Sequence, residues 1–267
     1  MKYKAHDIIN SLPGIHLLTN DTVDTFLYGN PDIPVKGIAV TFLATLEQCK
    51  EAVRNNCNLI ITHEGIWYSH KDQNLGTIPQ SAFDPVYQGK HLFINSNNLC
   101  IYRYHDGIHR ALPDMITAGL IKELHWTQHE ISQKPAYSIL ELNMPLKTIL
   151  QHIKQQLGIS FIRYMGDLDR IIHKVIIAVG YRGSGQLILP VLAQEQIDAI
   201  IYGEGPEWEI PEYCRDALHL GQNRALIILG HGASESPGMR LLTHELQVQY
   251  KNIPVYYFPF KNQFMIG

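Results

Sequence analysis

The sequence has few cysteines, and their spacing forms no motif. Cys49, Cys57, Cys100 and Cys214 contain no CxxC pair, so the spacing indicates neither a thiolate zinc site nor a disulfide framework. No apolar stretch is long enough to cross a membrane, and the N-terminus lacks the apolar region of a signal peptide. Unpaired cysteines are typical of reducing compartments, so we expect a cytoplasmic protein that does not associate with membranes.

The sequence also lacks an excess of positive charge. Its 22 Lys and Arg stand against 25 Asp and Glu, and the net charge is −3. Without a broad basic surface, a nucleic-acid partner is not expected. Hydrophobic residues make up 45% of the 267 positions, which is ordinary for a chain that folds into one large or two smaller globular domains.

Histidine is the residue type that stands out, with 14 copies. Two similar segments, LCIYRYHDGIH and ALIILGHGASE, each carry an apolar run that ends in a histidine. A second possible metal ligand follows four positions later, which pairs His105 with His109 and His231 with Glu235. A third apolar run, NLIITHE, ends in adjacent His63 and Glu64. Neutral imidazole is the commonest metal ligand in proteins, so the three segments indicate a metal site.

The order of apolar runs predicts an α/β fold. A strand over 35–44, a helix over 45–55 and a strand over 58–65 form a βαβ unit. Strands at 174–180, 198–205 and 224–231 alternate with helices in the same way, and the final helix is predicted to begin at Ser236-Pro237. We therefore predict two related halves with mixed, mostly parallel sheets, and ligands at the carboxyl ends of the strands. The predicted halves are residues 1–110 and 111–267, with the metal site in the cleft between them.

Each ligand pair also has an ordinary explanation. His63 and Glu64 would face opposite ways on a continuing strand, and both reach one site only if the strand ends at Gly65. His105 and His109 share one face if a helical turn starts there, and Asp106 would then orient a ring or be a ligand itself. Otherwise they are two surface histidines. Glu235 alone would be a helix-dipole partner in a first turn.

The combined set suits two divalent ions better than one structural zinc. Its four imidazoles and two carboxylates exceed the four ligands of a tetrahedral site, and the lack of thiolates favours Fe, Mn, Zn, Co or Ni. The expected cofactors are thus two divalent metal ions per subunit, and the predicted ligands are His63, Glu64, His105, His109, His231 and Glu235.

Other residues leave alternatives open. The loop GYRGSG at 180–185 either packs a tight turn or binds a substrate phosphate with help from Arg182. Glu204 and Trp208 follow a strand as Glu64 does, and are candidates to line the cleft. The other histidines, such as His125, His129, His173 and His244, lack a comparable context and are read as surface or core residues.

At these motifs the chain resembles the Nif-three-like dinuclear metal-centre family, whose members often carry the name GTP cyclohydrolase 1 type 2 homologue. The resemblance rests on LIITHxG, the strand-His-x-x-x-ligand segment, the Gly-rich turn, YGE and GHxxxE, in that order. It implies metal ligation by His63, His105, His231 and Glu235, a toroidal homohexamer with metal sites facing an internal cavity, and one Nif-three-like fold without the family's insertion domain. The chain departs from the family at Glu64, where a histidine is usual, and at His109, where an aspartate is usual.

The leading functional hypothesis is a metal-dependent hydrolase acting on a small molecule, with phosphorylated and nucleotide-like compounds as candidate substrates. Two ions would activate a water near neutral pH and polarise a substrate oxygen, with Glu64 or Asp106 as the catalytic base. One alternative is a non-enzymatic metal-binding or regulatory protein with a partner of its own. Another is the ring opening of GTP.

Overall fold

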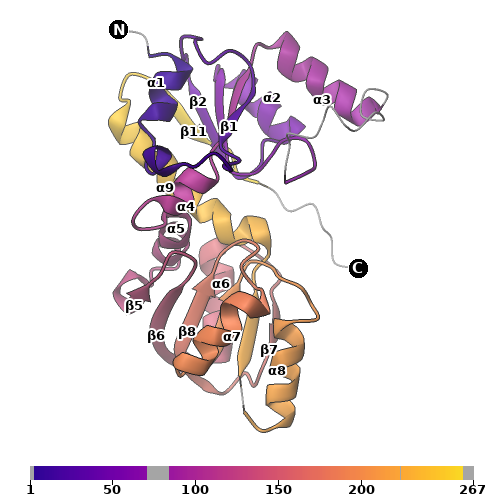
Figure 1. Cartoon of the computed structure of the whole chain (residues 1–267), viewed down its shortest axis with the longest axis vertical. Coiled ribbons are helices and arrows are strands. Elements are labelled where there is room, and N and C mark those ends of the chain that lie inside the picture. Colours follow the sequence, from indigo (N-terminus) through magenta and orange to yellow (C-terminus); the bar gives the residue numbers. More distant parts are fainter. Residues whose placement is uncertain (1–2, 71–83, 223, 261–267) are drawn as a thin grey trace. The chain divides into compact units, whose positions relative to one another are not determined.

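The chain divides into two compact units. The computed structural model describes residues 3–70, 84–222 and 224–260 (Figure 1). One unit contains residues 1–112 and 239–267, and the other contains residues 113–238. The sequence placed all of 111–267 in the second half, whereas the described residues from 239 onward group with the first unit. The reason is that strand β11 (Val255–Tyr257) is hydrogen-bonded to β2 (Ile38–Thr41).

The first unit is built on a five-stranded sheet with the order β1-β4-β3-β2-β11. All pairs are parallel except the antiparallel pair of β1 with β4. Its elements in chain order are α1 (Ala5–Asn10), η1 (Ile15–Leu17), β1 (Thr25–Tyr28), β2, α2 (Leu46–Arg54), β3 (Leu59–Thr62), α3 (Pro85–Ser96), β4 (Cys100–Arg103), α4 (Asp106–Arg110), the end of α9 (His231–Gln249) and β11. The βαβ unit β2-α2-β3 is confirmed.

The second unit contains a six-stranded mixed sheet with the order β5-β6-β8-β9-β10-β7, whose parallel centre is β8-β9-β10. Its elements are α5 (Met115–Glu123), η3 (Thr127–His129), β5 (Glu130–Gln133), β6 (Ser138–Pro145), α6 (Leu146–Leu157), β7 (Arg163–Met165), β8 (Ile171–Ala178), α7 (Gly185–Gln194), β9 (Ala199–Tyr202), α8 (Ile210–His219), β10 (Ala225–Ile228) and the start of α9. The predicted fold class, two α/β halves with mixed and mostly parallel sheets, is confirmed.

The parallel strands at the centre of each sheet are buried and mostly apolar. Every residue of β2, β3 and β4 is buried, as is every residue of β9. Strands covered on both faces read as continuous aliphatic runs, which is why LIIT, CIYR and AIIY could be recognised in the sequence. The ends of these strands are therefore the places where polar side chains leave the core.

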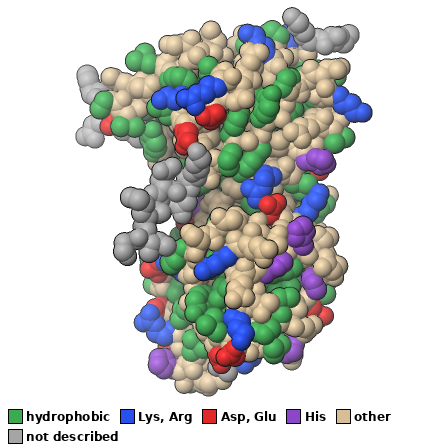
Figure 2. All heavy atoms as spheres, turned by 180° about the vertical axis from the view of Figure 1, so that it is seen from behind, with side chains coloured by type: hydrophobic (Ala, Val, Ile, Leu, Met, Phe, Trp, Pro, Cys, Tyr) green, Lys and Arg blue, Asp and Glu red, His purple; other side chains and the backbone are tan. Residues whose placement is uncertain are grey.

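Within the described residues, none of the helices is both long and apolar enough to span a bilayer. On the face drawn in Figure 2, basic and acidic side chains are interspersed, with no large area of one sign. This agrees with the near-balanced charge of the sequence.

In the second unit, helices α5 and α9 approach each other closely at a glycine in each. A Cβ on Gly119 of α5 would lie 2.4 Å from Cα of Gly238, in α9. We expect Gly119→Ala to lower the free energy of unfolding by at least about 2 kcal/mol, because backbone atoms must move apart. The control Gly89→Ala, in an exposed part of α3 with open space around it, should raise stability by roughly 0.5–1 kcal/mol. Urea denaturation of both variants tests this, and equal effects would contradict it.

Candidate metal centre

His63 is the first residue after β3, and it is completely buried. Parallel pairing places Thr62 opposite Arg103, so the chain after β3 runs beside the chain after β4. The ring Nδ1 of His63 lies 3.2 Å from the backbone carbonyl of Tyr104. A carbonyl only accepts hydrogen bonds, so Nδ1 carries the proton and Nε2 carries the lone pair that can bind a metal ion.

The turn after β4 is organised by Asp24, a residue that follows no motif in the sequence. Its Oδ1 accepts hydrogen bonds from the backbone N–H groups of His105 and Asp106 at 2.8 and 2.6 Å, and its Oδ2 accepts from Gly107 at 2.8 Å. Asp24 is 7% exposed. The carboxylate accepts hydrogen bonds from the amides at the start of α4, which have no acceptor within the helix. The helix α4 follows His105 directly, so the predicted helical turn between His105 and His109 is confirmed.

Asp106 orients the imidazole of His105. Its Oδ1 lies 2.9 Å from His105 Nδ1, and its Oδ2 accepts from the Thr22 hydroxyl at 2.9 Å. The hydrogen bond from His105, joined by that from Thr22, holds the pKa of Asp106 well below its usual range. Burial lowers the pKa of His105, although the bond to Asp106 opposes this shift. His105 is therefore a neutral imidazole at pH 7, with Nε2 as its ligand atom.

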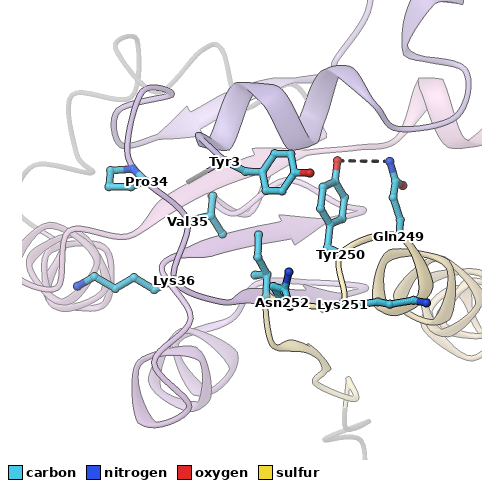
Figure 3. Close-up of a pocket in the computed structure, with 9 residues that line it drawn as sticks. Tyr3, Pro34, Val35, Lys36, Gln249, Tyr250, Lys251 and Asn252 are labelled. Atoms are coloured by element: carbon cyan, nitrogen blue, oxygen red, sulfur yellow. Dashed lines mark hydrogen bonds between the residues drawn. The ribbon is translucent and has the colours of Figure 1, made fainter. Parts of the chain in front are cut away.

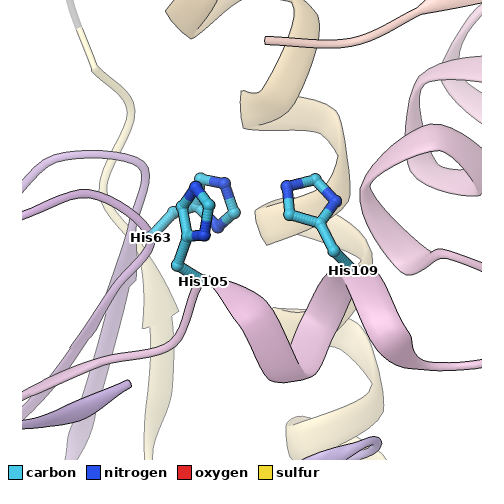
Figure 4. Close-up of side chains that lie close together, drawn as sticks. All are labelled: His63, His105 and His109. Atoms are coloured by element: carbon cyan, nitrogen blue, oxygen red, sulfur yellow. The ribbon is translucent and has the colours of Figure 1, made fainter. Parts of the chain in front are cut away.

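Three histidines of the first unit, His63, His105 and His109, form a compact group (Figure 4). The ring centroids of His63 and His105 are 4.7 Å apart and nearly stacked, and His109 stands edge-on to both at 5.1 and 5.2 Å. Each ring offers one nitrogen, and the three nitrogens lie within 4.8 Å of one another. Three imidazoles without a thiolate fit a divalent transition-metal ion and leave further coordination positions open.

Glu64 lies beside this group and is paired with a buried arginine. Its Oε2 is 2.8 Å from a terminal nitrogen (NH2) of Arg103, and its Oε1 is 3.7 Å from Nε2 of His105. His70, which the sequence did not single out, is also close, with its Nδ1 3.8 Å from Oε2 of Glu64. Ligand atoms of Glu64, His70 and His105 form a second group within 4.8 Å.

In the second unit, His231 and Glu235 are brought together by a helix that begins earlier than predicted. The helix α9 starts at His231 rather than at Ser236-Pro237. Gly230 adopts a φ of +90° just before it, and the helical bond from Ser234 N–H to Gly230 carbonyl closes the first turn. The i, i+4 spacing then places Nε2 of His231 3.0 Å from Oε2 of Glu235.

Glu204 holds the other nitrogen of His231. Its Oε1 lies 2.9 Å from His231 Nδ1, so His231 has a carboxylate partner just as His105 has Asp106. The YGE segment that follows β9 thus contributes a residue that orients a ligand. Trp208, the other candidate in this segment, is 76% exposed and takes no part in the arrangement.

Gly180, which closely follows β8, leaves the space that Glu235 occupies. It has a φ of +59°, and a Cβ there would lie 2.0 Å from Oε1 of Glu235 and 3.2 Å from Nε2 of His231. The hydroxyl of Ser234 accepts a hydrogen bond from Gly180 N–H at 2.9 Å and donates to the carbonyl of His231 at 2.8 Å. Glu235 is 2% exposed, so its carboxylate is buried against backbone and not in solvent.

The GYRGSG loop packs as a tight turn. Gly183 N–H donates to the carbonyl of Glu204, and a Cβ on Gly183 would lie 2.7 Å from that oxygen. The N–H of Gly185, at the start of α7, donates to Oε2 of Glu209 at 2.5 Å, so a carboxylate lies where a phosphate would bind. Arg182 pairs with Asp114 at 2.9 Å. These contacts support the turn and not the phosphate alternative.

A pocket of about 560 Å³ in the first unit lies among other residues (Figure 3). Its lining includes Tyr3, Lys36, Tyr250 and Lys251, and none of the lining residues is a histidine, cysteine or acid. It therefore offers no metal ligands, and the histidine group remains the stronger candidate for chemistry.

The comparison with known proteins gives the family. A sequence model of Duf34/NIF3 (NGG1p interacting factor 3) matches residues 7–263. The chain belongs to the Duf34/NIF3 family. A Clostridium acetobutylicum relative named GTP cyclohydrolase 1 type 2 homolog is 26% identical over 231 residues, which cover 83% of this chain and 80% of the relative. The resemblance inferred from the motifs is thereby confirmed.

Solved structures share this fold of the Duf34/NIF3 family. The structure of protein ybgI matches with a TM-score of 0.76 at 20% identity, covering 97% of this chain and 99% of that one. A Bacillus cereus protein related to NIF3 matches with a TM-score of 0.76 at 16% identity, covering 100% and 99%. At these identities the likeness shows the fold, whereas the chemistry depends on the residues of this chain's own site.

The Asp24 turn provides a test of how this Duf34/NIF3 chain positions His105. Asp24→Ala leaves three amides, one buried and two part-buried, without their acceptor. We expect the free energy of unfolding to fall by about 2–3 kcal/mol. The control Asp32→Ala removes an exposed ion pair with Lys4 and should cost no more than about 1 kcal/mol. Chemical denaturation compares the two, and losses of similar size would show that Asp24 has no special role.

The space at Gly180 provides a second test. Gly158, which ends α6, has a similar φ of +64°, but a Cβ at that position would meet nothing within 4 Å. Gly158→Ala should therefore cost only the backbone strain, about 1–2 kcal/mol. Gly180→Ala adds the clash with Glu235 and should cost clearly more. If denaturation curves of the two variants coincide, the packing of Gly180 against Glu235 is not what requires glycine.

Proposed function

We propose that the chain is a metal-dependent hydrolase acting on a small molecule. The observation that supports this most is the group of His63, His105 and His109, in which two rings are oriented through Nδ1 by fixed acceptors. Prearranged neutral imidazoles bind divalent ions without first reorganising. His231 and Glu235 are the ligands that we propose from the second unit, and two ions per subunit is the number that the sequence suggests.

A divalent ion held by these residues would supply Lewis acidity, which polarises a substrate oxygen and lowers the pKa of a water molecule. The residues around it divide the remaining tasks. Both oxygens of Asp106 are used by His105 and Thr22, so we assign Asp106 the role of orienting His105. Oε1 of Glu64 faces the histidine group while Oε2 is held by Arg103. We therefore assign the general base to Glu64 and not to Asp106.

Two other functions use the same residues. A non-enzymatic metal-binding or regulatory protein would need the ligands but no base. GTP ring opening is suggested by the name that the relatives carry, and it would release formate. A cytoplasmic location and a homohexamer, which come from the cysteine pattern and the family resemblance, belong to the same proposal.

Metal content is the first experiment. Protein made without a histidine tag should contain about two divalent ions per chain, measured by inductively coupled plasma mass spectrometry. His63→Ala and His231→Ala should each lose at least half of it, because each removes a proposed ligand. The control His173→Ala removes a histidine that bonds Asn143, and it should retain the full content. Trace metal in the wild type, unchanged in both ligand variants, would rule the proposal out.

Activity then separates the three functions. Phosphoesters, nucleotides and cyclic amides should be assayed with Mn, Fe, Zn, Co and Ni, with formate release from GTP followed separately. Turnover that falls at least about 100-fold in Glu64→Gln while metal is retained supports the hydrolase with Glu64 as base. Formate release would favour ring opening, and metal binding without turnover of any substrate would favour the non-enzymatic alternative.

A further inference from the structure

An arginine lies at the end of an otherwise apolar strand beside the proposed site. Arg103 is the last residue of β4, paired across the sheet with Thr62 of β3 and Thr25 of β1. Its side chain is 1% exposed. Arginine remains charged in proteins, so this is a permanent positive charge within the core of the first unit.

The guanidinium of Arg103 contacts two members of the second group of possible ligands. One terminal nitrogen, NH2, lies 2.8 Å from Oε2 of Glu64 and 3.2 Å from Nδ1 of His70. The other, NH1, donates to the backbone carbonyl of His70. The guanidinium therefore contacts the carboxylate of Glu64 and the imidazole of His70. Without it, both groups would be available to an ion bound by Glu64, His70 and His105.

A metal ion and this guanidinium compete for the same atoms. Arginine can only donate hydrogen bonds, so its contact with His70 uses the lone pair of Nδ1. A divalent ion at this group would have to displace the guanidinium from both partners, and it would be repelled by the buried charge that remained. An ion bound by His63, His105 and His109 needs none of the atoms of Glu64 and His70 that the guanidinium contacts.

We propose that Arg103 is the resident cation of the Glu64–His70–His105 group and determines where metal binds. It neutralises Glu64 and excludes a metal ion from this group, so that the ion of the first unit binds to His63, His105 and His109. This inference rests on the proposed metal binding for its location, and it makes Glu64 a partner of arginine and not a metal ligand.

Metal titration of tag-free protein with Mn²⁺ or Zn²⁺ tests the proposal by the number of ions per chain. Arg103→Gln removes the charge and should bind one more ion than the wild type. Glu64 and His70 would hold this ion together with water, because Nε2 of His105 is already a ligand of the ion bound with His63 and His109. Arg103→Lys is the matched control, because it keeps a cation on the strand, and it should bind the same number as the wild type. The double variant Arg103→Gln/Glu64→Gln should lose the additional ion. An unchanged number in folded Arg103→Gln, checked by circular dichroism, would overturn the proposal.

A second variant keeps the test decisive if Arg103→Gln does not fold. Glu64→Gln in the wild-type background should leave the number of bound ions unchanged, whereas the loss of one ion would identify Glu64 as a ligand and refute the inference. The outcomes also separate this inference from the proposed function. A wild type without metal refutes the proposed function, and a gain of one ion in Arg103→Gln then still supports the exclusion of metal by Arg103. A metal-containing wild type with an unchanged Arg103→Gln refutes the inference alone.

Discussion

The carboxylate of Asp24 is the interaction on which the rest of the histidine group depends. It accepts hydrogen bonds from three successive backbone amides, those of residues 105–107, at the point where β4 gives way to α4. A turn this tight would otherwise leave buried N–H groups without acceptors. Because the turn is fixed, His105 lies beside His63 and the helical spacing brings His109 to both.

Orientation of imidazoles through Nδ1 is common to the two units. His63 uses the carbonyl of Tyr104, His105 uses Asp106, and His231 uses Glu204. For His63 and His105 the fixed acceptor determines the tautomer and leaves Nε2 as the metal-binding atom. Nε2 of His231 faces Glu235, the residue proposed to bind metal with it. A metal site built in this way requires little rearrangement on binding, which is why the geometry supports metal binding more strongly than any single residue does.

Much of the fold could be predicted because buried parallel strands have continuous aliphatic sequences. The strands LIIT, CIYR and AIIY lie where the sequence predicts them, and so does the helix over 45–55. The predicted start of α9 was wrong, since Pro237 suggested a first turn although the helix begins at His231. A proline in the second turn of a helix is uncommon, and only the bonds made after Gly230 show that the helix has already begun.

The sequence determined which side chains are available, because apolar strands that end in histidine or acid deliver those residues to the carboxyl edge of a sheet. It did not reveal Asp24, Glu204 or Arg103 as partners, since each acts on residues at least 27 positions away in the chain. Arg103 within LCIYRYH was the visible signal, as a charge in a buried strand needs a partner. Tertiary structure decided the partner, because strand pairing alone brings Arg103 to Glu64. The candidate metal ligands could therefore be predicted from the sequence. Their tautomers, their charge balance and their grouping depend on contacts that form only in the folded protein.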